Sequence, residues 1–378
     1  MNRFTRVKLK NWRNFKTVDV ALADRVFVVG ANATGKSNFL DVFRFLHELA
    51  RDGGGLTNAL QGSNRGGFKK IRSLHASRNQ AMRIEVECDL DGTTWGYALE
   101  LEEQGSTRVA KEEVWRKGRK LLARPNSQDK GDVELLSDTA LEHNAANKEF
   151  RALRDFFRSV DYIHVVPQLI RNPASDDAAR FGKGLGATLI RRIQECPNNP
   201  RKKRLRAIAK ALKSVLPQFT ELDFYVGDGG LPHLRARYEH WRKNGGWQDE
   251  DTFSDGTLRL IGFLWFFLEG DGPLLLEEPE LSLQTEIVRR IPGILARLNV
   301  DSGRQVLLTT HSPELLSDAG IDLSEILILD GRKGATVVLE AQKDAPMVAA
   351  AKADVALGRI AIDRARAPRV DQLSLDLP

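Results

Sequence analysis

The chain has 378 residues, of which 42% are hydrophobic and 29% are charged, and its formal net charge is +6 at pH 7. This composition excludes a generally disordered chain, and the length suggests two or three domains. No run of about 18 apolar residues occurs, and residues 1–12 contain no apolar signal core, so we expect neither a membrane span nor secretion. The chain has two cysteines, Cys88 and Cys196, far apart in the sequence, which argues against a disulfide framework and a structural zinc site and favours a cytoplasmic location.

The first third of the chain is predicted to be rich in strands. Residues 4–22 alternate apolar and polar side chains, as half-buried strands do, and residues 25–30 form a continuous apolar strand. A glycine-containing loop and an amphipathic helix follow over residues 30–50. Residues 82–101 alternate again around Asp91-Gly92, which predicts a β-hairpin.

The rest of the chain mixes helices and strands. Residues 148–160 have a helical apolar face, residues 162–166 resemble a strand, and residues 168–216 are helical and basic. Strand periodicity returns at 221–226 and 231–239, and 260–270 is an apolar, buried helix. Short apolar strands at 273–280, 305–312 and 325–330, separated by helices, indicate an α/β class. Residues 346–369 are rich in Ala and Arg and show no apolar face.

Residues 30–37, "GANATGKS", fit the phosphate-binding pattern G-x-x-x-x-G-K-[ST] between a predicted strand and a predicted helix. Backbone N–H groups of such a loop bind phosphates, and the following helix adds the positive end of its dipole. Lys36 is expected to contact the β- and γ-phosphates and Ser37 to ligate Mg²⁺. The expected nucleotide-binding residues of this loop are Gly30, Asn32, Gly35, Lys36, Ser37 and Asn38.

The second motif is acidic and follows a predicted buried strand. "PLLLEEPE" ends in Glu277 and Glu278, an arrangement that delivers carboxylates to Mg²⁺ and to the attacking water in phosphoryl-transfer sites. Glu277 is predicted to be the metal ligand and Glu278 the residue that polarises water. Taken alone, the two acids could equally stabilise the N-terminus of the next helix.

Three neighbouring motifs resemble those of the ATP-binding-cassette (ABC) ATPases, and more closely their RecF and SMC branch and the ATPases related to the overcoming-lysogenization-defect proteins. "FSDGT" resembles the family signature, with Ser254 and Gly256 matching it and Phe253 and Asp255 as variants. "EEPELSLQ" resembles the D-E-P-E-x-x-L-H stretch, with Glu277 in place of Asp. "LLTTHS" ends in His311, which matches the switch histidine near the γ-phosphate.

The resemblance implies an α/β fold, namely an ABC-type P-loop ATPase head with a mixed central sheet, an antiparallel β subdomain and a helical insertion. The expected parts are an N-terminal ATPase lobe (1–167), a helical, basic insertion that returns to strands (168–250), a C-terminal ATPase lobe (251–345) and a tail (346–378). "NWRNF" resembles a strand end that contacts nucleotide, which suggests Arg13 as a further contact, although it could also be an ordinary surface arginine. Gln61 is a weak candidate for the glutamine that senses Mg²⁺.

In this family the signature helix closes over ATP bound to a second subunit. The resemblance therefore implies an ATP-dependent, head-to-tail homodimer in which Ser254 and Gly256 of one subunit complete the site of the other. A helix start with free N–H groups suits such an anion contact. Catalysis would use Glu278, His311 and Lys36, with ATP and Mg²⁺ as cofactors.

Partners are suggested by two basic or apolar segments. Residues 201–216 form an amphipathic basic helix whose apolar face consists of Leu205, Ile208, Leu212 and Val215. Its basic side chains could contact DNA phosphates, or they could simply form a solvated helix face. Weaker candidates for a DNA contact are Lys69, Lys70 and Arg72. "QLSLDL", Gln372–Leu377, resembles the peptide with which bacterial replication proteins dock on the sliding clamp, or it could pack on its own ATPase core.

Three roles remain open. The protein could be an ATPase that acts in DNA maintenance or at the replication fork, or an anti-phage defence ATPase that controls a separate effector chain. In the third role it hydrolyses ATP negligibly and acts as an ATP-gated scaffold. The residues after 330 are too few for an appended nuclease domain, so a cutting activity would come from a partner chain.

Overall fold

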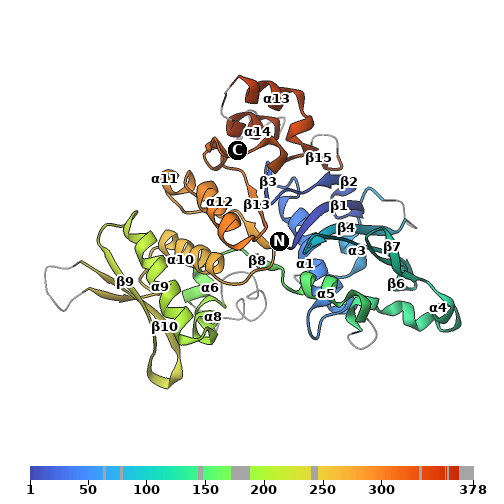
Figure 1. Ribbon diagram of the computed structural model, residues 1–378, viewed down its shortest axis with the longest axis horizontal. Helices are drawn as coiled ribbons and strands as arrows, with labels where there is room; N and C mark the ends of the chain where they lie inside the picture. Colours follow the sequence, from blue (N-terminus) through green and yellow to red (C-terminus); the bar gives the residue numbers. More distant parts are fainter. Residues whose placement is uncertain are drawn as a thin grey trace, which may run out of the picture. The chain divides into compact units, whose positions relative to one another are not determined.

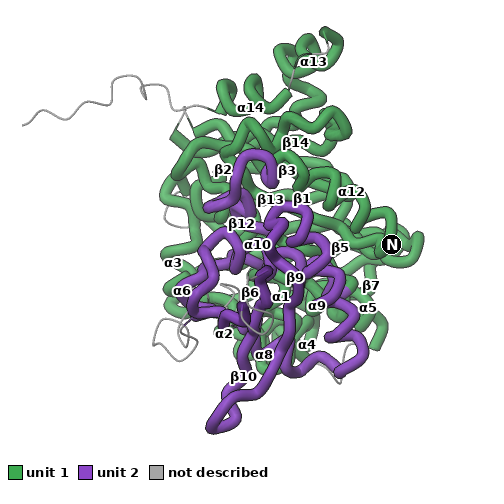
Figure 2. Tube along the Cα trace, turned by 90° about the vertical axis from the view of Figure 1, so that its left-hand side faces the viewer, with its two compact units in different colours: residues 1–161, 271–275, 289–378 green, residues 162–270, 276–288 purple. Residues whose placement is uncertain are grey.

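The structure is a computed structural model that describes residues 1–62, 65–76, 80–143, 148–171, 188–239, 246–331, 334–353, 355 and 357–365. Figure 2 colours the two compact units of the chain, of which unit 1 comprises residues 1–161, 271–275 and 289–378, and unit 2 comprises residues 162–270 and 276–288. The tail segment 372–377 lies outside the described residues. Among the described residues, no helix is both long and apolar enough to cross a membrane.

Unit 1 contains an antiparallel sheet with the strand order β2-β1-β4-β5-β6-β7. Its strands are β1 (Arg3–Trp12), β2 (Phe15–Ala21), β4 (Met82–Leu90), β5 (Thr93–Gln104), β6 (Ser106–Arg116) and β7 (Arg119–Arg124). Every second residue of β4 is buried, as its alternating pattern predicts. The predicted hairpin is confirmed, and its turn residues Asp91 and Gly92 have φ of 50° and 73°, the left-handed conformation that suits a two-residue hairpin loop.

A second, mixed sheet has the order β15-β14-β3-β13-β12-β8. The apolar strand β3 (Arg25–Gly30) pairs in parallel with β13 (Val306–Thr310) and β14 (Ile326–Asp330), and β15 (Val337–Glu340) pairs with β14 in antiparallel. Strands β8 (Asp161–Ile163) and β12 (Leu274–Glu277) begin in unit 1 and continue into unit 2 along the chain. The predicted α/β class with a mixed sheet is therefore confirmed.

Unit 1 also contains helices, most of which are labelled in Figure 1. They are α1 (Lys36–Ala50), α2 (Leu56–Gln61), α3 (Phe68–Ile71), α4 (Ser127–Gly131), α5 (Arg151–Arg158), α12 (Ile291–Ser302), α13 (Ala345–Lys352) and α14 (Leu357–Ala365). The apolar face predicted for residues 148–160 is buried, and Phe156 contacts Phe4 of β1 with a ring-centroid distance of 4.7 Å. Phe4 also lies 4.7 Å from Phe43 of α1, so aromatic packing joins β1, α1 and α5.

The C-terminal helices differ from the sequence-based interpretation. Residues 346–369 show no large apolar face, but Met347, Ala350 and Ala361 are buried. At Gly358 in α14, a Cβ atom would lie 2.3 Å from the Pro313 carbonyl oxygen. Small side chains thus let these helices approach their neighbours closely, a mode of packing that a search for large apolar residues does not detect.

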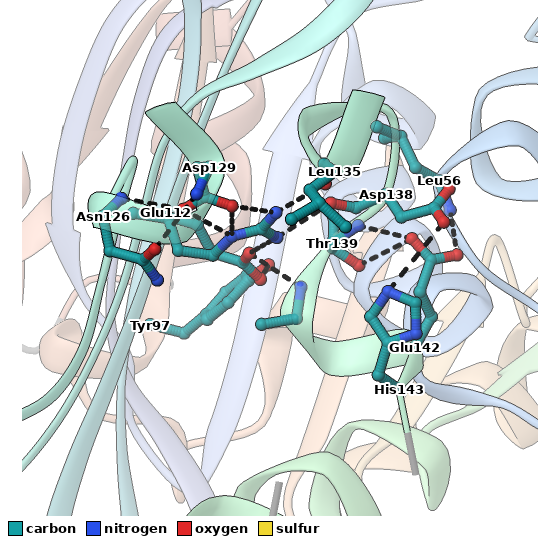
Figure 3. Close-up of polar contacts among 12 residues, drawn as sticks. Leu56, Tyr97, Glu112, Asn126, Asp129, Leu135, Asp138, Thr139, Glu142 and His143 are labelled. Carbon is teal, nitrogen blue, oxygen red and sulfur yellow. Dashed lines mark hydrogen bonds and ion pairs between the residues drawn. The ribbon is translucent and has the colours of Figure 1, made fainter. Parts of the chain in front are cut away.

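A buried polar network ties the antiparallel sheet to the segment after it (Figure 3). Arg124 of β7 donates to Asp129 at 2.8 Å and to Glu112 of β6 at 3.2 Å. Glu112 also accepts from the Tyr97 hydroxyl at 2.9 Å and from the Ala140 amide at 2.7 Å. Because each buried polar group has a partner, the network fixes the outer strands without the cost of an unpaired charge.

Unit 2 consists of a helical layer and a small antiparallel sheet of order β11-β10-β9. Its elements are α6 (Pro167–Arg171), α8 (Leu189–Glu195), α9 (Asn198–Lys213), β9 (Phe219–Val226), β10 (Pro232–Tyr238), β11 (Trp247–Asp249), α10 (Asp255–Leu268) and α11 (Thr285–Val288). The predicted apolar face of α9 is buried at Leu205, Ile208 and Leu212. Val215 is 36% exposed because the helix ends at Lys213, so its assignment to that face was wrong.

Candidate nucleotide site

The phosphate-binding loop lies between β3 and α1 in unit 1. Its backbone turns through positive φ at Ala33 (64°) and Gly35 (96°), and Gly35 is the N-cap of α1. The Lys36 ammonium donates to the Gly30 carbonyl oxygen at 3.0 Å, and its side chain is 6% exposed, while Ser37 is exposed. A buried cation beside a helix N-terminus whose cap residue has no side chain is the arrangement that receives the phosphates of a nucleotide.

Asn14, in the turn between β1 and β2, holds this loop from outside, a role that the sequence did not reveal. Its side-chain amide donates to the Thr34 carbonyl oxygen and to the Thr336 hydroxyl, both at 2.7 Å, and its side-chain oxygen accepts from Asn38 at 2.8 Å. The Thr336 hydroxyl in turn donates to the Thr34 carbonyl oxygen at 2.8 Å. A Cβ atom at Gly35 would lie 2.2 Å from the Asn14 amide nitrogen, so only glycine fits beneath this clamp.

The parallel register of β13 and β3 brings His311 to the loop. Thr310 lies opposite Val29, so His311 follows at the level of Gly30, where the loop begins. Its side chain is exposed. The position follows from strand pairing alone, because the carboxyl ends of parallel strands meet at one edge of a sheet.

Arg13 and Gln61, the two weaker candidates, also lie in unit 1. The Arg13 guanidinium forms an ion pair with Asp41 of α1 at 2.8 Å, and Asp41 also pairs with the fully buried Arg65 at 2.7 Å. Burial opposes ionisation of Asp41, but Arg65 and Arg13 more than compensate and hold its pKa below the ordinary value. Gln61 is exposed at the last residue of α2.

The two predicted acids, Glu277 and Glu278, lie in unit 2 at the end of β12. The Tyr162 hydroxyl donates to a Glu277 side-chain oxygen, and the ring nitrogen Nδ1 of His164 lies 3.2 Å from the Glu277 carbonyl oxygen. Both partners come from β8 and the residues after it, 115 and 113 positions earlier in the chain. Glu278 has φ of 44°, which is unusual for a residue with a side chain and is the kind of local strain that collects at functional sites.

The predicted signature begins α10 in unit 2. Ser254 is the N-cap, and its hydroxyl accepts from the Thr257 amide at 3.2 Å. A Cβ atom at Gly256 would lie 2.7 Å from the Ser282 carbonyl oxygen, so the glycine lets the helix start pack on the residues that follow the two acids.

A second contact fixes the start of α10 against α6. Arg171 forms an ion pair with Asp255 at 2.7 Å and donates to the Phe253 carbonyl oxygen at 2.6 Å. Gln168 donates to Asp255 at 3.3 Å. These two α6 residues were missed by sequence reasoning, although Gln168 follows the strand that delivers Tyr162.

Arg259 faces the acids from the next turn of α10. It lines a cavity of about 10 Å³ together with Phe263, Glu277 and Glu278, among others. Its Nε has no hydrogen-bond partner among the described residues. Burial lowers the pKa of Arg259, against the opposing influence of Asp255 and Glu278. The cavity has room for about one water molecule.

The predicted metal ligands carry oxygen donors of the kind that Mg²⁺ prefers. Mg²⁺ in such sites keeps several waters and takes only one or two protein oxygens besides the phosphates. Among the described residues, no group of three or more His, Cys, Asp or Glu side chains could hold a metal by itself. Ser37, in unit 1, and Glu277, in unit 2, are the two predicted metal ligands.

A family model described as "AAA domain, putative AbiEii toxin, Type IV TA system" matches residues 25–317, which include the loop, the signature, both acids and His311. No curated protein matches the chain.

Solved head domains of Smc proteins share the fold. The SmcHead bound to the C-winged helix domain of ScpA is 15% identical, with a TM-score of 0.55 over 89% of this chain and 97% of that chain. The Smc head domain with an extended coiled coil, bound to the C-terminal domain of ScpA and derived from Pyrococcus furiosus, is 14% identical, with a TM-score of 0.52 over 93% and 100%. The Smc head domain with a coiled coil and joint from Pyrococcus yayanosii is 11% identical, with a TM-score of 0.53 over 94% and 100%. The predicted ABC/SMC-like P-loop ATPase head is thereby confirmed as the fold.

Proposed function

We propose, since the chain belongs to this AAA-domain family and has the fold of an SMC-type ATPase head, that it binds and hydrolyses Mg-ATP. The observation that carries the proposal is the loop Gly30–Ser37, with Lys36 buried on it and Asn14 clamped across it. A turn that binds no ligand does not need these hydrogen bonds from Asn14. A loop that binds phosphates does, because its backbone N–H groups must be held in a fixed arrangement.

Each predicted residue has a proposed role in this reaction. Lys36 and the loop amides bind the phosphates, Ser37 and Glu277 hold the metal ion, and His311 contacts the γ-phosphate. Mg²⁺ supplies charge neutralisation of the phosphates when it is bound. Glu278 orients and polarises the attacking water.

The Tyr162 hydroxyl orients the Glu277 carboxylate. The usual aspartate is one methylene shorter, so the longer glutamate side chain has an additional rotatable bond. A hydrogen bond from the tyrosine restricts that freedom and compensates for the substitution.

We further propose that ATP drives a head-to-tail dimer in which Ser254 and Gly256 contact the nucleotide of the second subunit. The capped start of α10 supports this proposal, because Ser254 and Arg171 fix the helix N-terminus in place before any partner arrives.

A Glu278→Gln variant tests turnover and dimerisation together. It is expected to bind ATP, to hydrolyse it ~100-fold more slowly, and to elute as a dimer with ATP and Mg²⁺ in gel filtration coupled to light scattering. Glu195→Gln, an exposed change in α8, is the matched control and should behave as the unmodified chain. A monomer at saturating ATP contradicts the dimer, and unchanged turnover contradicts the role of Glu278.

The biological role that we propose is DNA-linked, in maintenance or at the replication fork, with the tail segment 372–377 as the candidate sliding-clamp peptide. The second candidate is a defence ATPase that controls a separate effector chain, and the family description, which names a putative toxin of a toxin–antitoxin system, favours it. Measuring the ATPase rate with and without duplex DNA separates the two. Stimulation by DNA supports the maintenance role, and an unchanged rate supports the defence role.

A further inference from the structure

A groove with a volume of about 550 Å³ runs between helix α9 and strand β9 in unit 2. Its helix wall carries the side chains of Lys202, Arg206, Lys210 and Lys213, and its strand wall is formed by residues 220–223. Figure 1 shows α9 beside β9 and β10 within this unit. The groove plays no part in the proposed nucleotide chemistry.

The helix wall is a single cationic stripe. Its four cations are all exposed, and three of them, Lys202, Arg206 and Lys210, recur every fourth residue. Four residues of an α-helix rise about 6 Å, so these three charges form an evenly spaced row. Leu205 and Ala209 lie between them in the lining and make the bottom of this wall apolar.

The strand wall is an edge rather than a face. Successive side chains of a strand point to opposite faces, so a groove lined by four consecutive residues must border the backbone itself. Strand β9 is the outermost strand of its sheet and pairs only with β10 among the described strands. An edge with unpaired N–H and C=O groups is a template for an additional strand.

The strand edge favours a peptide over nucleic acid as the occupant, because only a peptide main chain can pair with the backbone of β9. The lining carries four cations against two acids, Glu221 and Asp223, and Asp223 already pairs with Arg235 at 2.8 Å, so the groove attracts an acidic segment. Two other α9 cations stack on aromatic rings. The guanidinium carbon of Arg201 lies 4.5 Å from the ring centroid of Phe224, and that of Arg204 lies 5.4 Å from the ring centroid of Trp265. The basic character of α9 is therefore concentrated on the groove.

We propose that this groove binds an extended, acidic segment of a partner protein as a fourth strand on β9. The main chain of the segment pairs with the free edge, which supplies affinity for any sequence. Alternate side chains of a strand are about 6.8 Å apart, close to the spacing of the cations on α9. Acidic residues at every second position of the segment therefore meet the row of cations, and this pattern supplies the specificity.

The experiment measures binding of a fluorescein-labelled synthetic peptide by anisotropy, using the full chain. The peptide is about ten residues long, with aspartate alternating with valine or threonine. An isomer with the aspartates in one block, and a copy N-methylated at alternate residues, are the peptide controls. Lys210→Glu and Lys203→Glu are the matched protein variants, because both change an exposed lysine of α9 but only Lys210 lines the groove.

The alternating peptide is expected to bind with micromolar affinity, and both control peptides at least ~10-fold more weakly. Lys210→Glu should weaken binding about 10-fold, while Lys203→Glu should change it less than about twofold. Amide hydrogen exchange at residues 220–223 should slow on binding, which a purely electrostatic contact would not produce.

Three results would overturn the proposal. They are equal binding of the three peptides, equal effects of the two lysine variants, and tight binding of single-stranded oligothymidylate in the groove with no binding of the peptide. None of these measurements requires ATP, so the peptide site and the ATPase proposal can fail separately.

Discussion

Replacing Asn14 by alanine tests whether the clamp on the phosphate-binding loop matters for nucleotide binding. The change removes three side-chain hydrogen bonds, to Thr34, Thr336 and Asn38, of 2.7–2.8 Å. Each contributes roughly 0.5–1.5 kcal/mol net. The Thr34 carbonyl oxygen keeps the Thr336 hydroxyl as a donor, so the lower half of the summed range applies, about 2 kcal/mol.

This loss should appear in two measurements. The Tm should fall by roughly 4–8 °C for a unit of this size. Because the loop must then be ordered by the ligand, the affinity for ATP, measured by calorimetry with a non-hydrolysable analogue, should fall ~10-fold, which corresponds to about 1.4 kcal/mol.

Asn58→Ala is the matched control, because Asn58 also donates two side-chain hydrogen bonds, to Gly53 and Gly54, but lies at an exposed position of α2. It should leave nucleotide affinity unchanged. The reasoning is refuted if Asn14→Ala lowers the Tm as expected while its ATP affinity stays within about twofold of the unmodified chain.

Three further predictions concern the predicted site residues of unit 2 and the helix that follows the loop. Gly256→Ala places a Cβ 2.7 Å from the Ser282 carbonyl oxygen, so the start of α10 must shift; steady-state ATP hydrolysis should fall at least ~10-fold in a folded protein, and an unchanged rate would show that this helix start is not used. Tyr162→Phe removes the hydroxyl that orients the carboxylate at the end of β12; the Mg²⁺ concentration at half-maximal ATPase rate should rise ~10-fold, whereas a role in packing alone would lower the Tm and leave the Mg²⁺ dependence unchanged. Asp41 has a pKa below its ordinary value in the folded chain, so it stabilises the fold above the unfolded pKa and loses that contribution as pH falls through the folded pKa. In the Asp41→Asn variant, the free energy of unfolding should therefore decline less steeply below about pH 4. At pH 7 the change should cost ~3 kcal/mol, because it leaves the buried Arg65 without its main partner. Urea titrations that give the same pH dependence of the free energy of unfolding for both chains would contradict this prediction.

Each of these three variants has a matched control in the chain. Gly131→Ala adds a Cβ where nothing lies within 4 Å. Tyr225→Phe removes a tyrosine hydroxyl from the small sheet of unit 2, remote in sequence from the acids. Asp19→Asn breaks an exposed ion pair with Arg6, which should leave the free energy of unfolding nearly unchanged because solvent screens exposed pairs.

The local patterns of the sequence determined several elements of this protein without help from the fold. The loop Gly30–Ser37 was predicted because glycine, lysine and serine at that spacing between a strand and a helix have one common physical use. The hairpin around Asp91-Gly92 followed from strict alternation and from turn residues that tolerate positive φ. The signature at Ser254 was expected to begin a helix, and it does, with the Ser254 hydroxyl accepting from the Thr257 amide at 3.2 Å.

Only the tertiary structure decided which distant residues serve these elements. Thr336 lies 322 positions from Asn14, and Tyr162 lies 115 positions from Glu277, yet each pair is hydrogen-bonded. Arg13 was suggested as a nucleotide contact or an ordinary surface arginine, and the fold adds an ion pair with Asp41 that the sequence did not predict. The sequence left open whether the basic helix 201–216 contacts DNA or is a solvated helix face, and the fold places four of its cations beside the outer strand β9. The reason is that strand order and register bring distant segments together, and no periodicity within a segment encodes which edge or turn it will meet.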